Sequence, residues 1–164
     1  MGNSLNSKAE LLEKLPEHAA LKAMLAWKPE ALTDATWERN ELTLTIAARE
    51  IRGAAAAMQA AGYNFFEDMT AVDWFPSKPR FQLSYHLLSH TFKEYIRLRI
   101  FVDGDSPSAP SITPVWPSAN YYEREVFDLF GIRFEEHPNL RRILMPDEWV
   151  GHPLRKDYPV EGYR

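Results

Sequence analysis

The chain has 164 residues, 12 prolines, no cysteine and a formal net charge of −4. A chain of this length forms one domain that can bury a core without covalent cross-links. The lack of cysteine excludes disulfides, a thiolate nucleophile, and any cysteine-bound zinc or iron–sulfur cluster supplied by this chain.

The first third of the chain predicts a helix followed by two strands. Ser7, with a glutamate three residues later, is typical of a capping box that opens a helix. Pro16 should kink or restart this helix, which we expect to run to about Trp27. Residues 36–47, "TWERNELTLTIA", alternate in a way that predicts two strands folded back on each other.

The middle of the chain predicts a second helix and three strands. Residues 50–62 are rich in alanine, the best helix former, and Gly62 stands where helices end. Residues 65–75 are aromatic and β-branched, and two prolines then mark a turn. Residues 80–90 and 94–102 alternate apolar and mostly polar side chains, which favours two further strands.

The remaining elements complete the predicted domain. Residues 103–117 are expected to form a loop, followed by a short helix over 118–130 that Ser118 or Asn120 could cap and that Gly131 ends. The order α-β-β-α-β-β-β-α predicts a two-layer α+β domain, residues 1–134, with a mainly antiparallel or mixed sheet. No apolar stretch is long enough for a membrane span, and we expect a soluble chain made in the cytoplasm.

Residues 135–164 predict an extended, proline-broken tail. Four prolines follow His137 and leave no room for a full-length helix, yet residues 137–164 carry ten large apolar side chains. Such a segment is too apolar for disorder and must lie against its own domain or against a partner, because an exposed apolar strip invites aggregation. Trp149 would be a natural anchor at an interface with a partner.

Two histidines in this tail could ligate a metal. His137 and His152, together with Asp147 or Asp157, supply suitable ligand types, but their spacing matches no compact zinc site. The simpler interpretation is that each histidine packs beside its following proline and bonds a carbonyl or carboxylate. We therefore expect no metal in this chain.

The predicted helix over 118–130 carries two carboxylates on one face. Glu125 and Asp128 are three residues apart, a spacing that could serve general acid–base catalysis. Arg124 stands four residues before Asp128 and could pair with it. The favoured interpretation is therefore an exposed, ion-paired helix face beside an apolar stripe.

The basic residues of the tail could also contact RNA. Arg141, Arg142, Arg155 and Lys156 lie near Trp149 and other aromatic residues that could stack on bases. Acidic residues alternate with them, and the whole chain is acidic, so we expect no nucleic-acid partner. Arginines at a protein interface pair with carboxylates and tolerate partial burial, and this role fits the pattern better.

Several motifs resemble one known family. Residues 123–144, "EREVFDLFGIRFEEHPNLRRIL", resemble the signature of the 30-kDa subunit of respiratory complex I, the proton-translocating NADH:quinone oxidoreductase; in bacteria this is the C subunit. The similarity continues into "PDEWVGHPLRKDYP" and extends back through "TAVDW", "YHLLS" and "VWPSANYYERE". It covers about residues 65–160, while the N-terminal third matches no motif.

This resemblance implies a non-catalytic structural and assembly subunit in the peripheral arm, which braces the quinone-reducing module. The expected partners are the 49-kDa-type subunit and the iron–sulfur subunits B and I of the quinone module, on the cytoplasmic side of the bacterial inner membrane. Iron–sulfur clusters, FMN and quinone would belong to partner subunits, with no cofactor and no catalytic residue in this chain. The partner interface is assigned, by resemblance and by chemistry, to Glu123, Arg124, Glu125, Asp128, His137, Arg141, Arg142, Trp149, His152, Arg155, Lys156 and Asp157.

Other interpretations stay open. The same scaffold role could belong to a related complex with another donor or acceptor, such as a ferredoxin–plastoquinone reductase or a membrane-bound hydrogenase. A small metal-dependent hydrolase using His137, His152 and Asp157 is a more distant alternative. Glu136 departs from the family pattern, because many relatives have a small residue such as glycine there.

Overall fold

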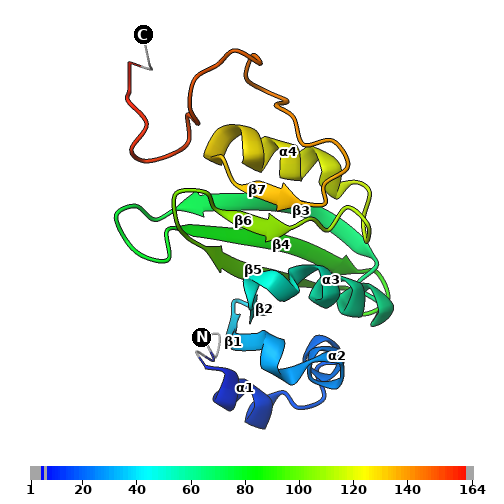
Figure 1. Cartoon of the computed structure of the whole chain (residues 1–164). Helices are drawn as coiled ribbons and strands as arrows, with labels where there is room; N and C mark the ends of the chain where they lie inside the picture. Colours follow the sequence, from blue (N-terminus) through cyan, green and yellow to red (C-terminus); the bar gives the residue numbers. More distant parts are fainter. Residues whose placement is uncertain (1–4, 6, 162–164) are drawn as a thin grey trace.

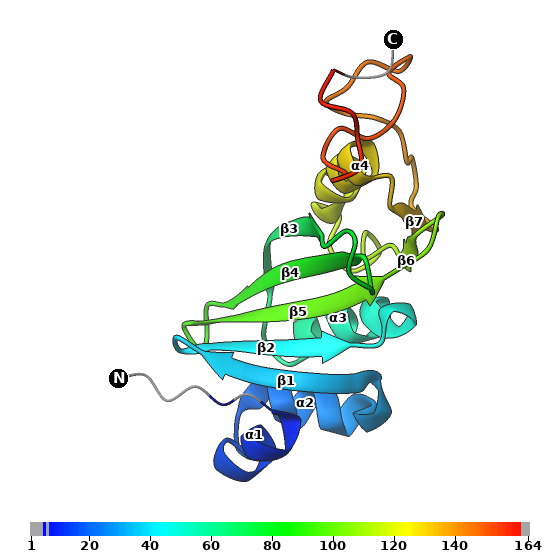
Figure 2. The same ribbon diagram turned by 90° about the vertical axis from the view of Figure 1, so that its left-hand side faces the viewer.

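A computed structural model describes residue 5 and residues 7–161 of the chain. Its main feature is a five-stranded mixed sheet with the strand order β1-β2-β5-β4-β3. The helices gather on one face of this sheet, and the C-terminal segment, described over residues 136–161, leaves β7 and loops past α4 (Figures 1 and 2). Within the described residues, no helix is long and apolar enough to cross a membrane.

The N-terminal helices follow the local sequence signals. α1 (Lys8–Lys14) begins at Ser7, whose hydroxyl accepts a hydrogen bond from the backbone N–H of Glu10. α2 (Ala19–Trp27) is a separate helix, because Pro16 falls in the break between the two. The predicted restart of the helix at Pro16 is therefore confirmed.

The predicted strand pair is an antiparallel hairpin of β1 (Leu32–Glu38) and β2 (Glu41–Ile46). Its two-residue turn is formed by Arg39 and Asn40, which both have positive φ, as hairpin turns of this length require. β1 starts four residues before the sequence pattern suggested. β2 then pairs in parallel with β5 (Glu94–Val102), which makes the sheet mixed.

The second half of the sheet is antiparallel. α3 (Ile51–Ala60) is followed by Gly62 with φ 105°, as the C-terminal glycine predicts. β3 (Phe65–Asp73), β4 (Phe81–Ser89) and β5 pair in sequence, and short 3₁₀ turns, η1 (Pro29–Ala31) and η2 (Ala48–Glu50), flank the first hairpin.

The loop predicted over residues 103–117 is only partly a loop. β6 (Ser108–Pro110) lies within it and pairs in parallel with β7 (Arg133–Glu135), so that a small second sheet brackets α4 (Ala119–Phe130). Strands of three residues carry too little alternation to stand out in a sequence. The predicted cap of α4 also differs, because the Ser118 hydroxyl makes no capping hydrogen bond.

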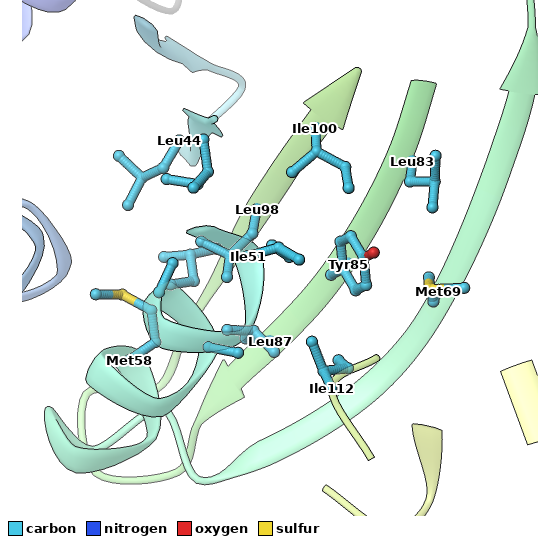
Figure 3. Packing of buried hydrophobic residues seen from close by; sticks show 14 of the residues in the cluster. Leu44, Ile51, Met58, Met69, Leu83, Tyr85, Leu87, Leu98, Ile100 and Ile112 are labelled. Atoms are coloured by element: carbon cyan, nitrogen blue, oxygen red, sulfur yellow. The ribbon is translucent and has the colours of Figure 1, made fainter. Parts of the chain in front are cut away.

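The core lies between the sheet and the helices. Alternate residues of the central strands point inward, among them Leu83, Tyr85, Leu98 and Ile100, and they meet Ile51 from α3 (Figure 3). α4 covers the β3 end of the same sheet face. The architecture is thus the predicted two-layer α+β domain, and it places α4 between the sheet and the C-terminal segment.

Candidate functional site: an anchored C-terminal segment

Asp128 on α4 is the main attachment point of the C-terminal segment. Its side chain is fully buried and accepts hydrogen bonds from three successive backbone N–H groups, those of Ile143, Leu144 and Met145, at 2.8–3.0 Å. Arg142 completes the site with an ion pair of 2.5 Å to the same carboxylate. Four donors around one carboxylate fix the course of this stretch of backbone.

The same arginine holds a second part of the segment. Arg142 donates to the carbonyl oxygens of Trp149 and Gly151, at 2.8 and 3.1 Å, and so closes the chain into a loop. Arg124 donates to the carbonyl oxygens of Arg141 and Arg142. The predicted pairing of Arg124 with Asp128 is therefore not formed, since both groups bind the C-terminal segment instead.

This geometry corrects the interpretation of α4 as an exposed, ion-paired face. Glu123 and Asp128 have no exposed surface, whereas Glu125 lies in solvent. Glu125 and Asp128 consequently do not form a pair of catalytic carboxylates. The pKa of Asp128 is lowered, because Met145 N–H, Arg142 and the other donors outweigh the burial that opposes ionisation.

His152 and Arg155 attach the segment at the C-terminal end of α4. His152 Nδ1 lies 2.9 Å from the carbonyl oxygen of Asp128, and Arg155 Nε donates to the carbonyl oxygen of Phe130 at 2.6 Å. Both side chains pass directly over Gly131, where an added Cβ would lie 2.5 Å from the His152 ring. Gly131 also has φ 73°, so this position needs glycine for two reasons.

A second buried aspartate binds the segment to the sheet. Asp73 at the end of β3 accepts the backbone N–H of Lys156 at 2.9 Å and pairs with Arg80 at 2.7 Å. Arg80 also pairs with Asp157 at 2.6 Å. Burial opposes the ionisation of Asp73, but Arg80 and the backbone donors prevail and lower its pKa.

Asp73 and Arg80 were not among the predicted site residues. "TAVDW" was one of the motifs that resembled the family, and it contains Asp73, but the sequence offers no sign that this carboxylate meets a backbone group 83 residues away. Lys156 contributes its backbone N–H to this contact.

Glu123 and His137 form a separate buried contact at the start of the segment. Glu123 accepts hydrogen bonds from the Ser111 hydroxyl and the Ile112 N–H, at 2.6 and 2.7 Å. His137 Nε2 lies 3.9 Å from this carboxylate and 3.4 Å from the carbonyl oxygen of Asn120, and both side chains are fully buried. Burial raises the pKa of Glu123 to about 7 and lowers that of His137.

The chain enters this segment through Glu136, which has φ 59°. A positive φ favours glycine, in line with the expectation that a small residue would suit this position. Here Glu136 pairs with Arg52 at 2.7 Å, so the glutamate contributes an ion pair in place of conformational freedom.

The histidines do not meet at a metal site. His137 lies against Asn120, His152 against Asp128, and Asp157 against Arg80. Across the described part of the chain, no group of three or more His, Asp or Glu side chains is arranged to hold a metal ion. The hydrolase alternative that needed His137, His152 and Asp157 together has no such constellation.

Leu140 packs against the domain core, but most of the other apolar side chains of the segment are exposed. Leu144 is 60% exposed and Val150 62%, and Trp149, Leu154 and Val160 are exposed as well. Trp149 and Val160 border a surface hollow that Pro153, Tyr158 and Pro159 also line. Polar groups therefore hold the backbone to the domain, while the apolar side chains are left for solvent or for a partner.

We predict that Asp128→Asn loosens residues 143–145 while leaving the sheet intact. The amide cannot accept the same set of N–H groups or balance Arg142, a loss of about 1–3 kcal/mol. Hydrogen exchange of the Ile143, Leu144 and Met145 amides should then accelerate roughly 5–150-fold. The exposed Glu125→Gln change on the same helix is the control, and unchanged protection in Asp128→Asn would contradict the anchoring role.

We also predict a pH effect of Glu123. Its carboxyl titrates near 7 when folded and near 4.5 when unfolded, so the folded state holds the extra proton between these values. The free energy of unfolding of the wild type should therefore fall relative to that of Glu123→Gln as the pH rises from 5 to 8, by about 3 kcal/mol at most. Chemical denaturation of both proteins across this range measures the difference, and parallel curves would refute it.

Comparisons with known proteins agree with the family resemblance that the sequence motifs indicate. The model of the family described as the 30-kDa subunit of respiratory-chain NADH dehydrogenase matches residues 44–164. The NADH-quinone oxidoreductase C subunit of Roseiflexus sp. (strain RS-1) is 42% identical over 149 residues, which cover 89% of this chain and 86% of that protein. The corresponding C subunit of Citrifermentans bemidjiense is 47% identical, with coverage of 80% and 83%.

Solved structures show the same fold. A trypsin-resistant fragment of Nqo5 superposes with a TM-score of 0.60 at 31% identity, covering 79% of this chain and 98% of the fragment. A chain of the membrane-bound sulfane sulfur reductase, an archaeal respiratory membrane complex, superposes with a TM-score of 0.69 at 25% identity, covering 85% of this chain and 84% of that one. The chain therefore belongs to the family of the 30-kDa subunit of respiratory-chain NADH dehydrogenase.

Proposed function

We propose that this chain is a non-catalytic scaffold subunit of proton-translocating NADH:quinone oxidoreductase. It would sit in the peripheral arm, on the cytoplasmic side of the bacterial inner membrane, and brace the quinone-reducing module. The single observation that carries this proposal is the C-terminal segment, whose backbone is held by buried aspartates while Leu144, Val150 and Leu154 remain exposed. The subunit names of the curated relatives support the identity of the complex.

The partners we propose are the 49-kDa-type subunit and the iron–sulfur subunits B and I of the quinone module. An apolar groove on such a partner would cover the exposed side chains of the C-terminal segment, with Trp149 as an anchor. The segment meets its partner already shaped, so less conformational entropy is lost on binding. Electron carriers, namely iron–sulfur clusters, FMN and quinone, would then reside in the partners.

The interface residues divide into two roles under this proposal. Glu123, Asp128 and His137 have buried side chains and would act by shaping the segment. Arg124, Arg142, His152 and Arg155 bind backbone carbonyls of the segment or of α4 and would act in the same way. Glu125, Arg141, Trp149 and Lys156 are exposed and remain available for direct contact, while Asp157 is exposed but already pairs with Arg80.

A related complex is the second candidate. The likeness to a chain of an archaeal respiratory membrane complex favours it, because the same scaffold could serve a complex with another electron donor or acceptor. Two of the four basic residues of the RNA alternative, Arg142 and Arg155, bind this chain's own carbonyl and carboxylate oxygens, whereas Arg141 and Lys156 are exposed.

We predict that truncation after Glu135 leaves a folded domain that no longer joins the complex. The apolar core lies almost entirely before this point, and Asp73 and Asp128 would become hydrated instead of remaining buried without partners. A similar solved structure is described as a trypsin-resistant fragment of Nqo5, which supports the expectation that the truncated domain resists proteolysis. Thermal unfolding reports the fold, and native gels of gently solubilised membranes report assembly together with NADH:quinone activity.

A milder set of substitutions separates the loss of contact with a partner from the loss of folding. Replacing Leu144, Val150 and Leu154 by alanine removes exposed apolar surface only, so the unfolding temperature should stay within a few degrees of the wild type while assembly falls. Phe92→Ala is the control, because Phe92 is also exposed but lies at the β4–β5 turn, away from the segment. Full assembly of the triple variant would reject the segment as the docking surface, and an unfolded truncated chain would show that it belongs to the core.

A further inference from the structure

The face of the main sheet opposite the helices carries no covering layer of described residues (Figures 1 and 2). Strand register places five side chains in one row across the middle of this face: Thr70, Ser84, Arg99, Thr45 and Asp34. The row is polar and holds one guanidinium group, that of Arg99, and one carboxylate, that of Asp34 on the edge strand, while Thr45 and Ser84 are buried. An open polar sheet face is common in antiparallel sheets, so polarity alone does not indicate a partner, whereas an unbalanced charge would.

One end of this open face carries apolar side chains on either side of a glutamine. Val72, Gln82 and Phe101 stand side by side in the neighbouring row of β3, β4 and β5. Val72 is 36% exposed, and Trp74, two residues further along, is 50% exposed. Apolar surface of this kind is available to a partner next to the central polar row.

The other end of the face is charged, and its charges satisfy one another. Arg97 pairs with Glu41 at 2.8 Å and donates to His86 Nε2 at the same distance. His86 in turn bonds Asp68 across the strand pair. The guanidinium of Arg97 therefore already has a carboxylate partner within this network.

Arg99, in the central row, differs from Arg97. It is half-buried, and it donates through Nε and one terminal nitrogen to the Thr45 hydroxyl, at 3.1 and 2.8 Å, with its guanidinium 5.5 Å from the centre of the Phe101 ring. Among the described residues no carboxylate lies within 4.0 Å of it; Asp34 and Glu38 act on it from further away. Burial lowers the pKa of Arg99, which is the mark of a cation short of counter-charge.

We propose that this uncovered sheet face is a second docking surface, which receives a segment of another subunit that presents a carboxylate to Arg99 and apolar side chains to Val72, Trp74 and Phe101. A carboxylate fits because a guanidinium offers it two parallel hydrogen bonds. A polyanion such as RNA or an anionic membrane does not fit, since Asp34, Glu38 and Glu41 share the face. The docking surface is distinct from the C-terminal segment, although it rests on the proposed function in taking its partner from the same complex.

Photo-crosslinking in the intact complex tests the location. A photoreactive phenylalanine analogue at Gln82, between Val72 and Phe101, should crosslink to another subunit of the complex. The same probe at Leu144 reports the C-terminal segment, and at Lys22, on the exposed side of α2, it serves as the negative control. A crosslink from Leu144 without one from Gln82 would refute the second docking surface and leave the proposed function standing. Absence of both crosslinks would refute the second docking surface and the proposed function together.

Charge variants test the chemistry independently of the bulky probe. Arg99→Glu should lower the amount of this chain recovered in the complex at least tenfold, Arg99→Gln less, and Arg99→Lys least, because only lysine keeps the cation. Arg49→Glu makes the same charge change at an 86% exposed side chain on η2 and should have no effect. Unchanged assembly of a folded Arg99→Glu protein, or a crosslink from Gln82 only to a second copy of this chain, would refute docking by another subunit.

Discussion

The carboxylate of Asp128 determines how residues 142–151 are arranged. A buried carboxylate is costly unless donors surround it, and here three successive backbone N–H groups and Arg142 supply them. Because Arg142 also binds the carbonyls of Trp149 and Gly151, one residue of α4 controls about ten residues of the segment. A proline-rich segment, which has few backbone hydrogen bonds of its own, obtains its order in this way.

Because polar groups attach the C-terminal segment to the domain, its apolar side chains stay available for binding. If apolar contacts held the segment to the domain, the side chains most useful to a partner would already be buried. Backbone groups make the attachments at Asp73 and Asp128 instead, so Leu144, Val150 and Leu154 stay exposed on a segment of fixed shape. Pre-ordering of this kind reduces the entropy lost on association and makes the segment suited to a permanent subunit interface.

Much of the fold could be predicted from the sequence, because its signals are local. The Ser7 cap, the break at Pro16, the β1–β2 hairpin and the glycine after α4 each depend on a few neighbouring residues. The attachments of the C-terminal segment could not be predicted in detail, since Asp73 and Lys156 meet across 83 residues. Arg124 and Asp128 show the same limit. Their spacing favours an ion pair on a helix, but in the folded chain both side chains bind the C-terminal segment instead.

α4 carries two fully buried carboxylates with opposite electrostatic behaviour. Asp128 has an arginine and three N–H donors, so its pKa falls, whereas burial of Glu123 outweighs its two donors and the charge of Arg52, so its pKa rises to about 7. The attachment at Asp128 is therefore fully present at neutral pH and is lost only as the pH falls below the ordinary range of an aspartate. Glu123, which binds Ser111 and Ile112 in the loop after β6, changes its charge close to neutrality. Burial alone does not decide the charge of a group in this helix; the number of donors facing it does. Arg99, which is half-buried, has the Thr45 hydroxyl as a partner but no carboxylate within 4.0 Å among the described residues.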